Sequence, residues 1–194
     1  PIYPLDTRPP TPSNLEGEPP ALPDIAVLSL ADIGCVADIE ETADTLEGNS
    51  LLKARYVYEH YHCDCFADDT GLEVSTLGGA PGVFTARYAS PSGDAAANRA
   101  KLLQQMHGAA DRQAQFRTAV TLFLNGRQYT CEGVVKGQIA TEQRGDGGFG
   151  YDSLFIPEGY DKTFAELPQT IKNSISHRGN ALKNMKKLIA EITQ

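Results

Sequence analysis

A long hairpin in the second half of the chain most constrains the fold. Its first strand alternates two sets of largely apolar side chains between Phe116 and Leu124, which predicts a strand mostly buried on both faces. Asn125-Gly126 follows directly and is typical of a two-residue hairpin turn. The return strand is expected to run from Tyr129 through Val135. The middle of the chain is therefore predicted to form a buried antiparallel pair.

Helices and further strands alternate around this hairpin. Apolar residues at helical spacing predict a helix over 45–61, capped by Asp44 or Thr45, and a last helix that begins near Ser176 or Arg178. The other expected elements are a helix from about 94 to 107, short strands near 25–28, 65–67, 72–74 and 154–156, and a long loop over 76–93. This alternation predicts an α/β fold in which helices flank a mixed β-sheet.

Residues 1–23 differ in composition from the rest of the chain. Eight of the twelve prolines fall there. Proline lacks an amide N–H and is unfavourable in helices and central strands, so this stretch is expected to be extended or irregular. We therefore predict an atypical proline-rich segment over 1–23 and a single domain over 24–194.

Charge and cysteine usage limit the class of protein. The 194 residues include 25 acids and 17 bases, and a net charge of -8 argues against general nucleic-acid binding, although local lysines or a metal ion can hold a nucleotide. No apolar run approaches the roughly 20 residues of a membrane helix, and no signal peptide opens the sequence. The four cysteines include no Cys-x-x-Cys pair, so free thiols in a cytoplasmic protein are expected.

Two adjacent carboxylates, Asp68 and Asp69, follow the predicted strand over 65–67, and Gly71 is expected to allow a sharp exit from it. Acids at the end of a strand lie where α/β sheets place ligands, and carboxylate oxygens suit Mg²⁺. Because side chains alternate along a strand, one of the two acids is expected to face a ligand. The alternative is a turn in which these side chains bond the backbone.

Glu41 and Lys53 lie before and within the first predicted helix. An acid near a helix N-terminus is also favoured by the helix dipole, and a lysine on a helix is commonly just solvated. Each of the two therefore has an explanation without function.

Two later segments offer groups for a ligand. The glycine-rich stretch from Gly145 to Asp152 lets backbone approach a ligand and presents Phe149 as a stacking surface. It matches G-x-G-x-x-G in form, but no strand and opening helix surround it, so a dinucleotide fold is not expected. The cluster from Lys172 to Gly179 gathers hydroxyl, imidazole and guanidinium donors that suit an anionic or carbonyl-rich ligand. A flexible connection and a satisfied core histidine are the alternatives.

Six segments, in the same order along the chain, resemble the inosine/xanthosine triphosphate pyrophosphatase family, which clears non-standard purine nucleotides. They are Glu40–Thr42, Asn49–Arg55, Ala67–Leu72, Leu77–Val83, Gly147–Asp152 and Ser174–Gly179. The resemblance implies an α/β fold with two lobes around a central cleft, a homodimer with the 77–88 loop near its interface, and no nucleic-acid or membrane partner. It also implies Mg²⁺-dependent hydrolysis of a purine nucleoside triphosphate (ITP, dITP or XTP) to the monophosphate and pyrophosphate.

The resemblance further implies a role for each matching residue. Glu41 and Asp69 would hold the metal ion, Asp69 would also activate the attacking water, and Asp68 would support it. The implied substrate-binding residues are Lys53, Thr70, Phe149, Gly150, Tyr151, Asp152, Lys172, His177 and Arg178. The two lysines would meet phosphate, and residues 149–152, His177 and Arg178 would form the base pocket. Arg178 can only donate hydrogen bonds, which favours a 6-oxo purine over adenine.

The beginning of the chain departs from the family pattern. Such proteins open with an apolar strand and a Thr-x-Asn-x-x-Lys loop that binds the triphosphate. Here Asn14 stands where the lysine is expected, and proline interrupts the segment. The alternative function is therefore an inactive or weakened nucleotide-binding dimer that has lost this loop.

Overall fold

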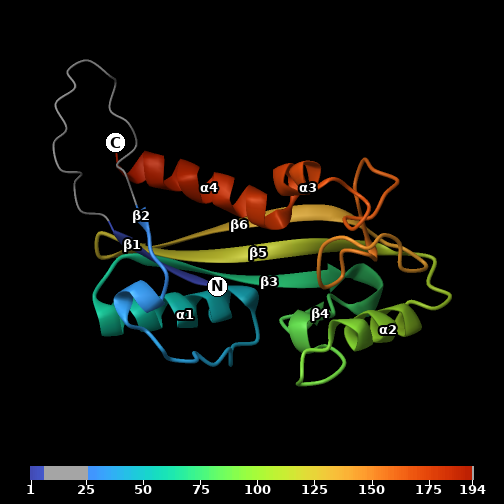
Figure 1. The fold of residues 1–194 in the computed structure, drawn as a ribbon, viewed down its shortest axis with the longest axis horizontal. Helices are drawn as coiled ribbons and strands as arrows, with labels where there is room; N and C mark the ends of the chain where they lie inside the picture. Colours follow the sequence, from blue (N-terminus) through green and yellow to red (C-terminus); the bar gives the residue numbers. More distant parts are fainter. Residues whose placement is uncertain (7–25, 194) are drawn as a thin grey trace, which may run out of the picture. The chain divides into compact units, whose positions relative to one another are not determined.

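The structure is a computed structural model that describes residues 1–6 and 26–193. Within these residues, seven strands form one sheet. Their order is β2-β1-β3-β5-β6-β7, and β4 pairs with β3 (Figure 1). The strands are β1 (Ile2–Asp6), β2 (Ala26–Val27), β3 (Cys65–Val74), β4 (Pro81–Gly82), β5 (Gln113–Leu124), β6 (Arg127–Ile139) and β7 (Phe155–Pro157). The helices are α1 (Leu46–Tyr61), α2 (Ala95–Gln105), α3 (Gln169–Ile175) and α4 (His177–Ile192), with short 3-10 turns at Ala31–Ile33, Ser75–Leu77 and Thr85–Arg87.

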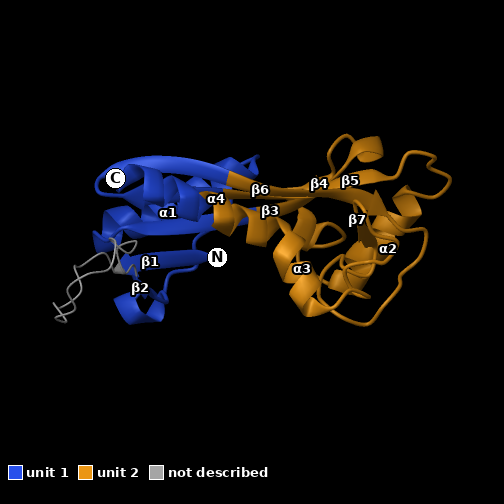
Figure 2. Ribbon diagram, turned by 90° about the horizontal axis from the view of Figure 1, so that it is seen from above, with its two compact units in different colours: residues 1–69, 120–131, 185–194 blue, residues 70–119, 132–184 orange. Residues whose placement is uncertain are grey.

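The chain divides into two compact units (Figure 2). Unit 1 comprises the described residues of 1–69, 120–131 and 185–194, and unit 2 comprises 70–119 and 132–184. Strands β3, β5 and β6 and helix α4 each begin in one unit and end in the other. The expectation of an α/β fold is confirmed, whereas the single domain over 24–194 and the central cleft stay predictions.

Helix α1 organises unit 1. Thr45 caps it by accepting a hydrogen bond from the Gly48 amide at 3.0 Å, as the sequence predicts. Ala54 and Val57 of the helix belong to a core cluster with Cys65 and Ala67 of β3 and with Phe123 of β5. These contacts hold the inward face of α1 against the strands of unit 1 and so position the side chains on that face.

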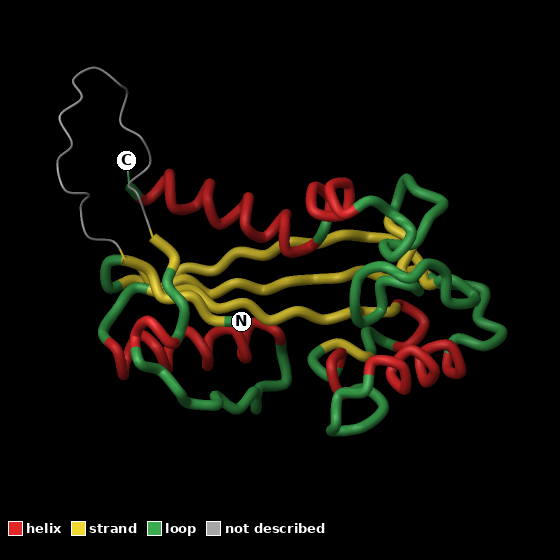
Figure 3. Tube along the Cα trace, in the orientation of Figure 1, coloured by secondary structure: helices red, strands yellow, loops and turns green. Residues whose placement is uncertain are grey.

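The core of unit 2 is built from β3, β5, β7 and α2. Leu72 and Val74 pack with Leu102 of α2 and with the rings of Phe116 and Phe155, whose centroids lie 4.8 Å apart. Figure 1 shows α2 and α3 on opposite sides of the strands of this unit. Residues 140–154, which carry the glycine-rich motif, form loops and turns (Figure 3).

One strand was predicted with the wrong end, and one helix was not predicted. The strand that begins at Cys65 does not end at Asp68-Asp69-Thr70-Gly71 but continues through Val74. Two non-local contacts extend it: the Thr70 hydroxyl bonds that of Thr118 at 2.8 Å, and Leu72 enters the core of unit 2. Helix α3 was also not expected as a separate element. It has only seven residues and no side-chain cap, so its sequence signal is weak.

Proline at position 4 does not prevent a strand, contrary to expectation. Residues 2–6 form β1, which pairs antiparallel with β2 and β3. The Pro4 carbonyl accepts from the Leu28 amide at 2.9 Å, so the N–H that proline lacks would point toward the two-residue strand β2. The Leu5 amide, which points the other way, donates to the Asp64 carbonyl at 2.7 Å. The rest of the proline-rich segment, including Asn14, lies outside the described residues.

Most other predicted elements match the structure, but the loop predicted over 76–93 contains the two-residue strand β4 and a 3-10 turn at Thr85–Arg87. Asn125 and Gly126 both have positive φ angles and close the hairpin between β5 and β6, as predicted. The four cysteine thiols are free. Within residues 1–6 and 26–193, no helix is long and apolar enough to cross a membrane.

Candidate active site

Two carboxylates of unit 1 converge on one ammonium group. The Nζ atom of Lys53, on the inward face of α1, lies 2.6 Å from Glu41 Oε1 and 3.5 Å from Asp69 Oδ1. Lys53 is only 5% exposed, so this cluster is largely shielded from water. Asp69 reaches the helix because it shares a strand face with Cys65 and Ala67, which pack against α1. The residues that sequence analysis assigned to the metal and to a phosphate are thus neighbours.

Asn49 positions the Asp69 carboxylate. It lies one turn before Lys53 on the same face of α1, and it is fully buried. Its Nδ2 atom donates to Asp69 Oδ2 at 3.2 Å, while its Oδ1 atom accepts from the Ala43 amide at 2.9 Å. The two oxygens of Asp69 therefore have different surroundings. Sequence analysis assigned no role to Asn49, although it lies in one of the six segments of the resemblance.

Asp68 and Asp69 point to opposite faces of β3, because successive side chains of a strand alternate. Asp68 is buried, with 7% exposed. The expectation that only one of the two acids faces the cluster around Lys53 agrees with this alternation. The supporting role of Asp68 stays a prediction.

Glu41 and Asp69 suit a magnesium site in which water and substrate supply most of the ligands. Magnesium takes one or two protein carboxylates, keeps several waters and accepts substrate phosphate oxygens as its other ligands. Glu41 and Asp69 already face a single cationic group, which shows that both can face one positive charge. Among the described residues, no group of three or more His, Cys, Asp or Glu side chains forms a cation site.

A cavity of about 540 Å³ in unit 2 gathers most of the remaining predicted residues. Its lining includes Thr70, Phe149, Gly150, Tyr151, Asp152, Lys172, His177 and Arg178. They come from β3, from the loop after β6 and from helices α3 and α4. Eight of the nine predicted substrate-binding residues thus line one cavity, and the ninth, Lys53, belongs to the cluster of unit 1.

A buried ion pair lies beside this cavity. Lys172 Nζ donates to Asp152 Oδ2 at 2.6 Å, and the same oxygen accepts from the Phe149 amide at 2.7 Å. Gly148 allows this arrangement: its φ is +75°, and a Cβ atom there would lie 2.1 Å from Asp152 Oδ2. Lys172 therefore already has a carboxylate partner.

Phe149 presents an open aromatic face in the same cavity. The residue is 68% exposed. Lys172 Nζ lies 4.9 Å from the ring centroid, and the guanidinium carbon of Arg178 lies 6.0 Å from it. A planar ligand can stack on this ring with two cations close by.

His177 is held as a neutral imidazole. Burial, followed by the charges of Arg178 and Lys172, lowers the pKa of His177 from 6.5 to about 3. Its Nδ1 atom lies 2.8 Å from Thr118 Oγ1, and its ring packs on Phe116 with centroids 4.9 Å apart. Gly133 of β6 makes room for this turn of α4, since a Cβ atom there would lie 2.1 Å from the His177 carbonyl oxygen.

One protein family matches residues 16–188, which make up most of this chain. The chain belongs to the Ham1 family. It is 54% identical to a dITP/XTP pyrophosphatase of Flavobacterium johnsoniae, over 83% of this chain and 84% of the relative. A dITP/XTP pyrophosphatase of Bacillus subtilis is 46% identical over 84% of each protein. These matches confirm the resemblance that the six segments predicted.

Solved structures of Ham1 proteins share the fold. The Ham1 protein of Staphylococcus aureus is 37% identical, with a TM-score of 0.78 over 80% of this chain and 82% of that one. A structure described as a nucleoside-triphosphatase / dITP/XTP pyrophosphatase from Mycobacterium abscessus is 41% identical, with a TM-score of 0.72 over 81% and 82%. The predicted fold and the predicted class, a nucleoside triphosphate pyrophosphatase, agree with these relatives.

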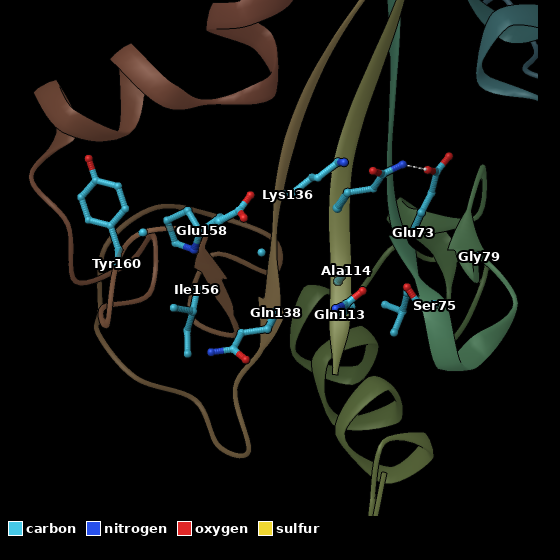
Figure 4. A pocket seen from close by; sticks show the side chains of 15 residues that line it. Glu73, Ser75, Gly79, Gln113, Ala114, Lys136, Gln138, Ile156, Glu158 and Tyr160 are labelled. Carbon is cyan, nitrogen blue, oxygen red and sulfur yellow. Dashed lines mark hydrogen bonds between the residues drawn. The ribbon is translucent and has the colours of Figure 1, made fainter. Parts of the chain in front are cut away.

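Unit 2 of this Ham1 chain also contains a larger cavity. It measures about 760 Å³ and contains none of the predicted site residues. Figure 4 shows that charged and amide side chains such as Lys136, Gln138 and Glu158 line it, and Glu73 accepts a hydrogen bond from Gln115 at 2.7 Å. The predicted substrate-binding residues other than Lys53 line the smaller cavity and not this one.

Arg99 of α2 holds the loop that carries Gly150 in the Ham1 chain, and this role was not expected from the sequence. Its Nη1 atom donates to the Gly150 carbonyl at 2.8 Å, and its Nε atom donates to Gln143 at 2.6 Å. Next to Gly150, the Tyr151 hydroxyl donates to the Thr85 carbonyl at 3.0 Å, and burial raises the pKa of Tyr151. No local signal marks Arg99, because its partners lie more than 40 positions away.

Proposed function

We propose that this chain hydrolyses the non-standard purine nucleoside triphosphates ITP, dITP and XTP to the monophosphate and pyrophosphate, with Mg²⁺, and so removes them from the nucleotide pool. The relatives named dITP/XTP pyrophosphatases support the reaction and the substrate class. The observation that carries the proposal is the convergence of Glu41 and Asp69 on Lys53. Hydrolysis of a triphosphate needs carboxylates that hold a metal ion, a cation that meets phosphate and a base that activates water. Glu41, Asp69 and Lys53 would supply these groups.

The hydrolytic step is assigned to the residues of unit 1. Glu41 and Asp69 would hold Mg²⁺, which supplies neutralisation of phosphate charge when bound. Asp69 accepts a proton from the attacking water, and Asn49 keeps its carboxylate oriented by holding Oδ2. Lys53 turns its ammonium group from the carboxylates toward phosphate oxygens. The different partners of the two Asp69 oxygens let one carboxylate serve two tasks.

Recognition of the base is assigned to the cavity of unit 2. Phe149 stacks on the purine, and Arg178 donates to an exocyclic oxygen. Adenine presents an amino group in place of that oxygen, so its donors would meet donors and stay unpaired. Lys172, which the resemblance assigns to phosphate, is paired with Asp152 at 2.6 Å and would have to leave this partner to meet a phosphate oxygen.

The test is pyrophosphate release from ITP, dITP and XTP with Mg²⁺, compared with ATP and GTP. We expect selective release of pyrophosphate without free phosphate. Asp69→Asn should abolish it, while Asp38→Asn, which changes an exposed acid of the same unit, should leave it intact. Nucleotide binding without turnover in the folded wild-type chain would contradict the proposal and support the weakened binding protein instead.

Two further expectations belong to this proposal. The homodimer implied by the resemblance is tested by light scattering on the purified chain at several concentrations. A cytoplasmic location is tested by fractionation of cells that express it. Neither result changes the assignment of the reaction, which depends on the pyrophosphate assay.

A further inference from the structure

A chain of hydroxyl and imidazole groups runs through the base pocket of unit 2. Thr70 Oγ1 lies 2.8 Å from Thr118 Oγ1, which lies 2.8 Å from His177 Nδ1. Thr70 and His177 line the cavity, whereas Thr118 is 1% exposed and does not. The buried hydroxyl therefore connects two groups that face a ligand without facing it itself.

Two arrangements of the protons let the buried Thr118 hydroxyl donate its own proton within the chain. A neutral imidazole carries one N–H, and the Thr118 hydroxyl has a single proton to donate. If Thr118 donates to Nδ1, the ring proton lies on Nε2, and Thr118 accepts from Thr70. If Nδ1 donates to Thr118, then Nε2 is an acceptor, and Thr118 donates to Thr70. In both cases the two groups that meet the ligand have opposite polarity.

We propose that Thr118 fixes His177 as the Nε2–H tautomer, so that His177 is a donor to oxo-purines and a poor partner for adenine. This rests on the proposed function, because the oxygens of hypoxanthine and xanthine need donors. Neutral imidazole also favours the Nε2–H form intrinsically, so the hydroxyl reinforces an existing preference. Thr118 is a positioning residue for specificity, since it acts through His177.

The surroundings of the ring keep the two nitrogens in place. Phe116 packs on the imidazole at 4.9 Å, and the close approach of α4 to Gly133 fixes the backbone of His177. A flip of the imidazole ring would place a ring carbon where Nδ1 lies and would break the hydrogen bond to Thr118. The proton arrangement is therefore the remaining variable, and the hydroxyl chain controls it.

The first test reads the tautomer directly. The ¹⁵N chemical shifts of the His177 ring, assigned by their loss in His177→Gln, are measured in the nucleotide-free protein at pH 7. We expect protonated Nε2 and unprotonated Nδ1 in the wild type and in Thr118→Ser. In Thr118→Val the two shifts should move toward each other, because Nδ1 has lost its donor. A protonated Nδ1 in the wild type, or unchanged shifts in Thr118→Val, would overturn the proposal.

The second test reads specificity. The ratio of kcat/KM for ITP to that for ATP should fall about tenfold in Thr118→Val and recover in Thr118→Ser. An altered tautomer with an unchanged ratio would overturn the role in specificity. A wild type that does not hydrolyse ITP refutes the proposed function, while the ¹⁵N result still decides the tautomer. If Thr118→Val does not fold, Thr118→Ala, which also removes the hydroxyl that donates to Nδ1, is measured in its place with the same expected direction.

Discussion

Replacement of Lys53 by methionine isolates the charge that holds the acidic cluster together. Methionine keeps the unbranched, apolar stem and removes the ammonium group that lies 2.6 Å from Glu41 and 3.5 Å from Asp69. Two carboxylates then face each other across a site in which the lysine was 5% exposed. We expect the variant to fold less stably and to respond more strongly to Mg²⁺ than the wild type.

The size of the effect follows from burial. Removing one partner of a buried ion pair costs roughly 3–5 kcal/mol. The Glu41 side chain is 33% exposed and that of Asp69 is 13% exposed, so water screens part of the repulsion and we expect about 2–3 kcal/mol. For a chain of this length each kcal/mol shifts Tm by about 2–4 °C, which gives a fall of about 4–12 °C. An ion present at a hundred times its Kd returns about 2.7 kcal/mol.

The assay is thermal unfolding with and without MgCl₂, at equal ionic strength set by KCl. Mg²⁺ should raise the Tm of Lys53→Met more than that of the wild type, because in the wild type the ion has to displace an ammonium group. The matched control is Lys187→Met, which removes an ammonium group that is 78% exposed and should change neither value. The reasoning is refuted if Lys53→Met melts with the wild type, or if both gain equally from Mg²⁺.

Three other predictions follow from the pocket of unit 2. Phe149→Ala should raise KM for ITP about five- to 160-fold with a smaller effect on kcat, since stacking on one ring stabilises a base by roughly 1–3 kcal/mol. Steady-state kinetics measures this change. Because the folded pKa of His177 is about 3 against 6.5 unfolded, the free energy of unfolding should fall as pH drops from 6.5 toward 3, and fall less in His177→Gln; urea titrations across this range decide it. Gly148→Ala should weaken ITP binding, because the added Cβ would lie 2.1 Å from the Asp152 carboxylate. Calorimetry measures the affinity, and Gly159→Ala, also at positive φ but in open space, is the control.

Elements with local signals were predictable from the sequence. The cap at Thr45 and the Asn125-Gly126 turn depend on residues within three or four positions, and both lie where expected. Strand β3 was misjudged because Asp-Asp-Thr-Gly is typical of a turn. Its continuation depends on Thr118, which is 48 positions away. Strand β1 was misjudged for a related reason: whether a proline is tolerated depends on which neighbour its missing N–H would face.

The candidate site divides in the same way. The candidate site residues could be named from the sequence, and apart from Asp68 the structure places them in one cluster and one cavity. Asn49 and Thr118 could not be given roles, because their partners Asp69 and His177 lie 20 and 59 positions away. A threonine in an alternating strand carries no mark of its contact with an imidazole. Residues that touch a ligand can thus be inferred from type and motif, whereas residues that orient them need the fold.

Strand β3 explains how adjacent residues take part in different networks. Asp69 faces α1 and bonds Asn49, while the next residue, Thr70, points to the other face and bonds Thr118. A shift of β3 by one residue would bring Asp68 or Thr70 to Lys53 and would exchange every side chain between the faces. The buried residues on both sides of the acids, Ala67 and Leu72, resist such a shift because each packs into a core cluster. The apolar residues that flank the two acids therefore determine which carboxylate faces Lys53.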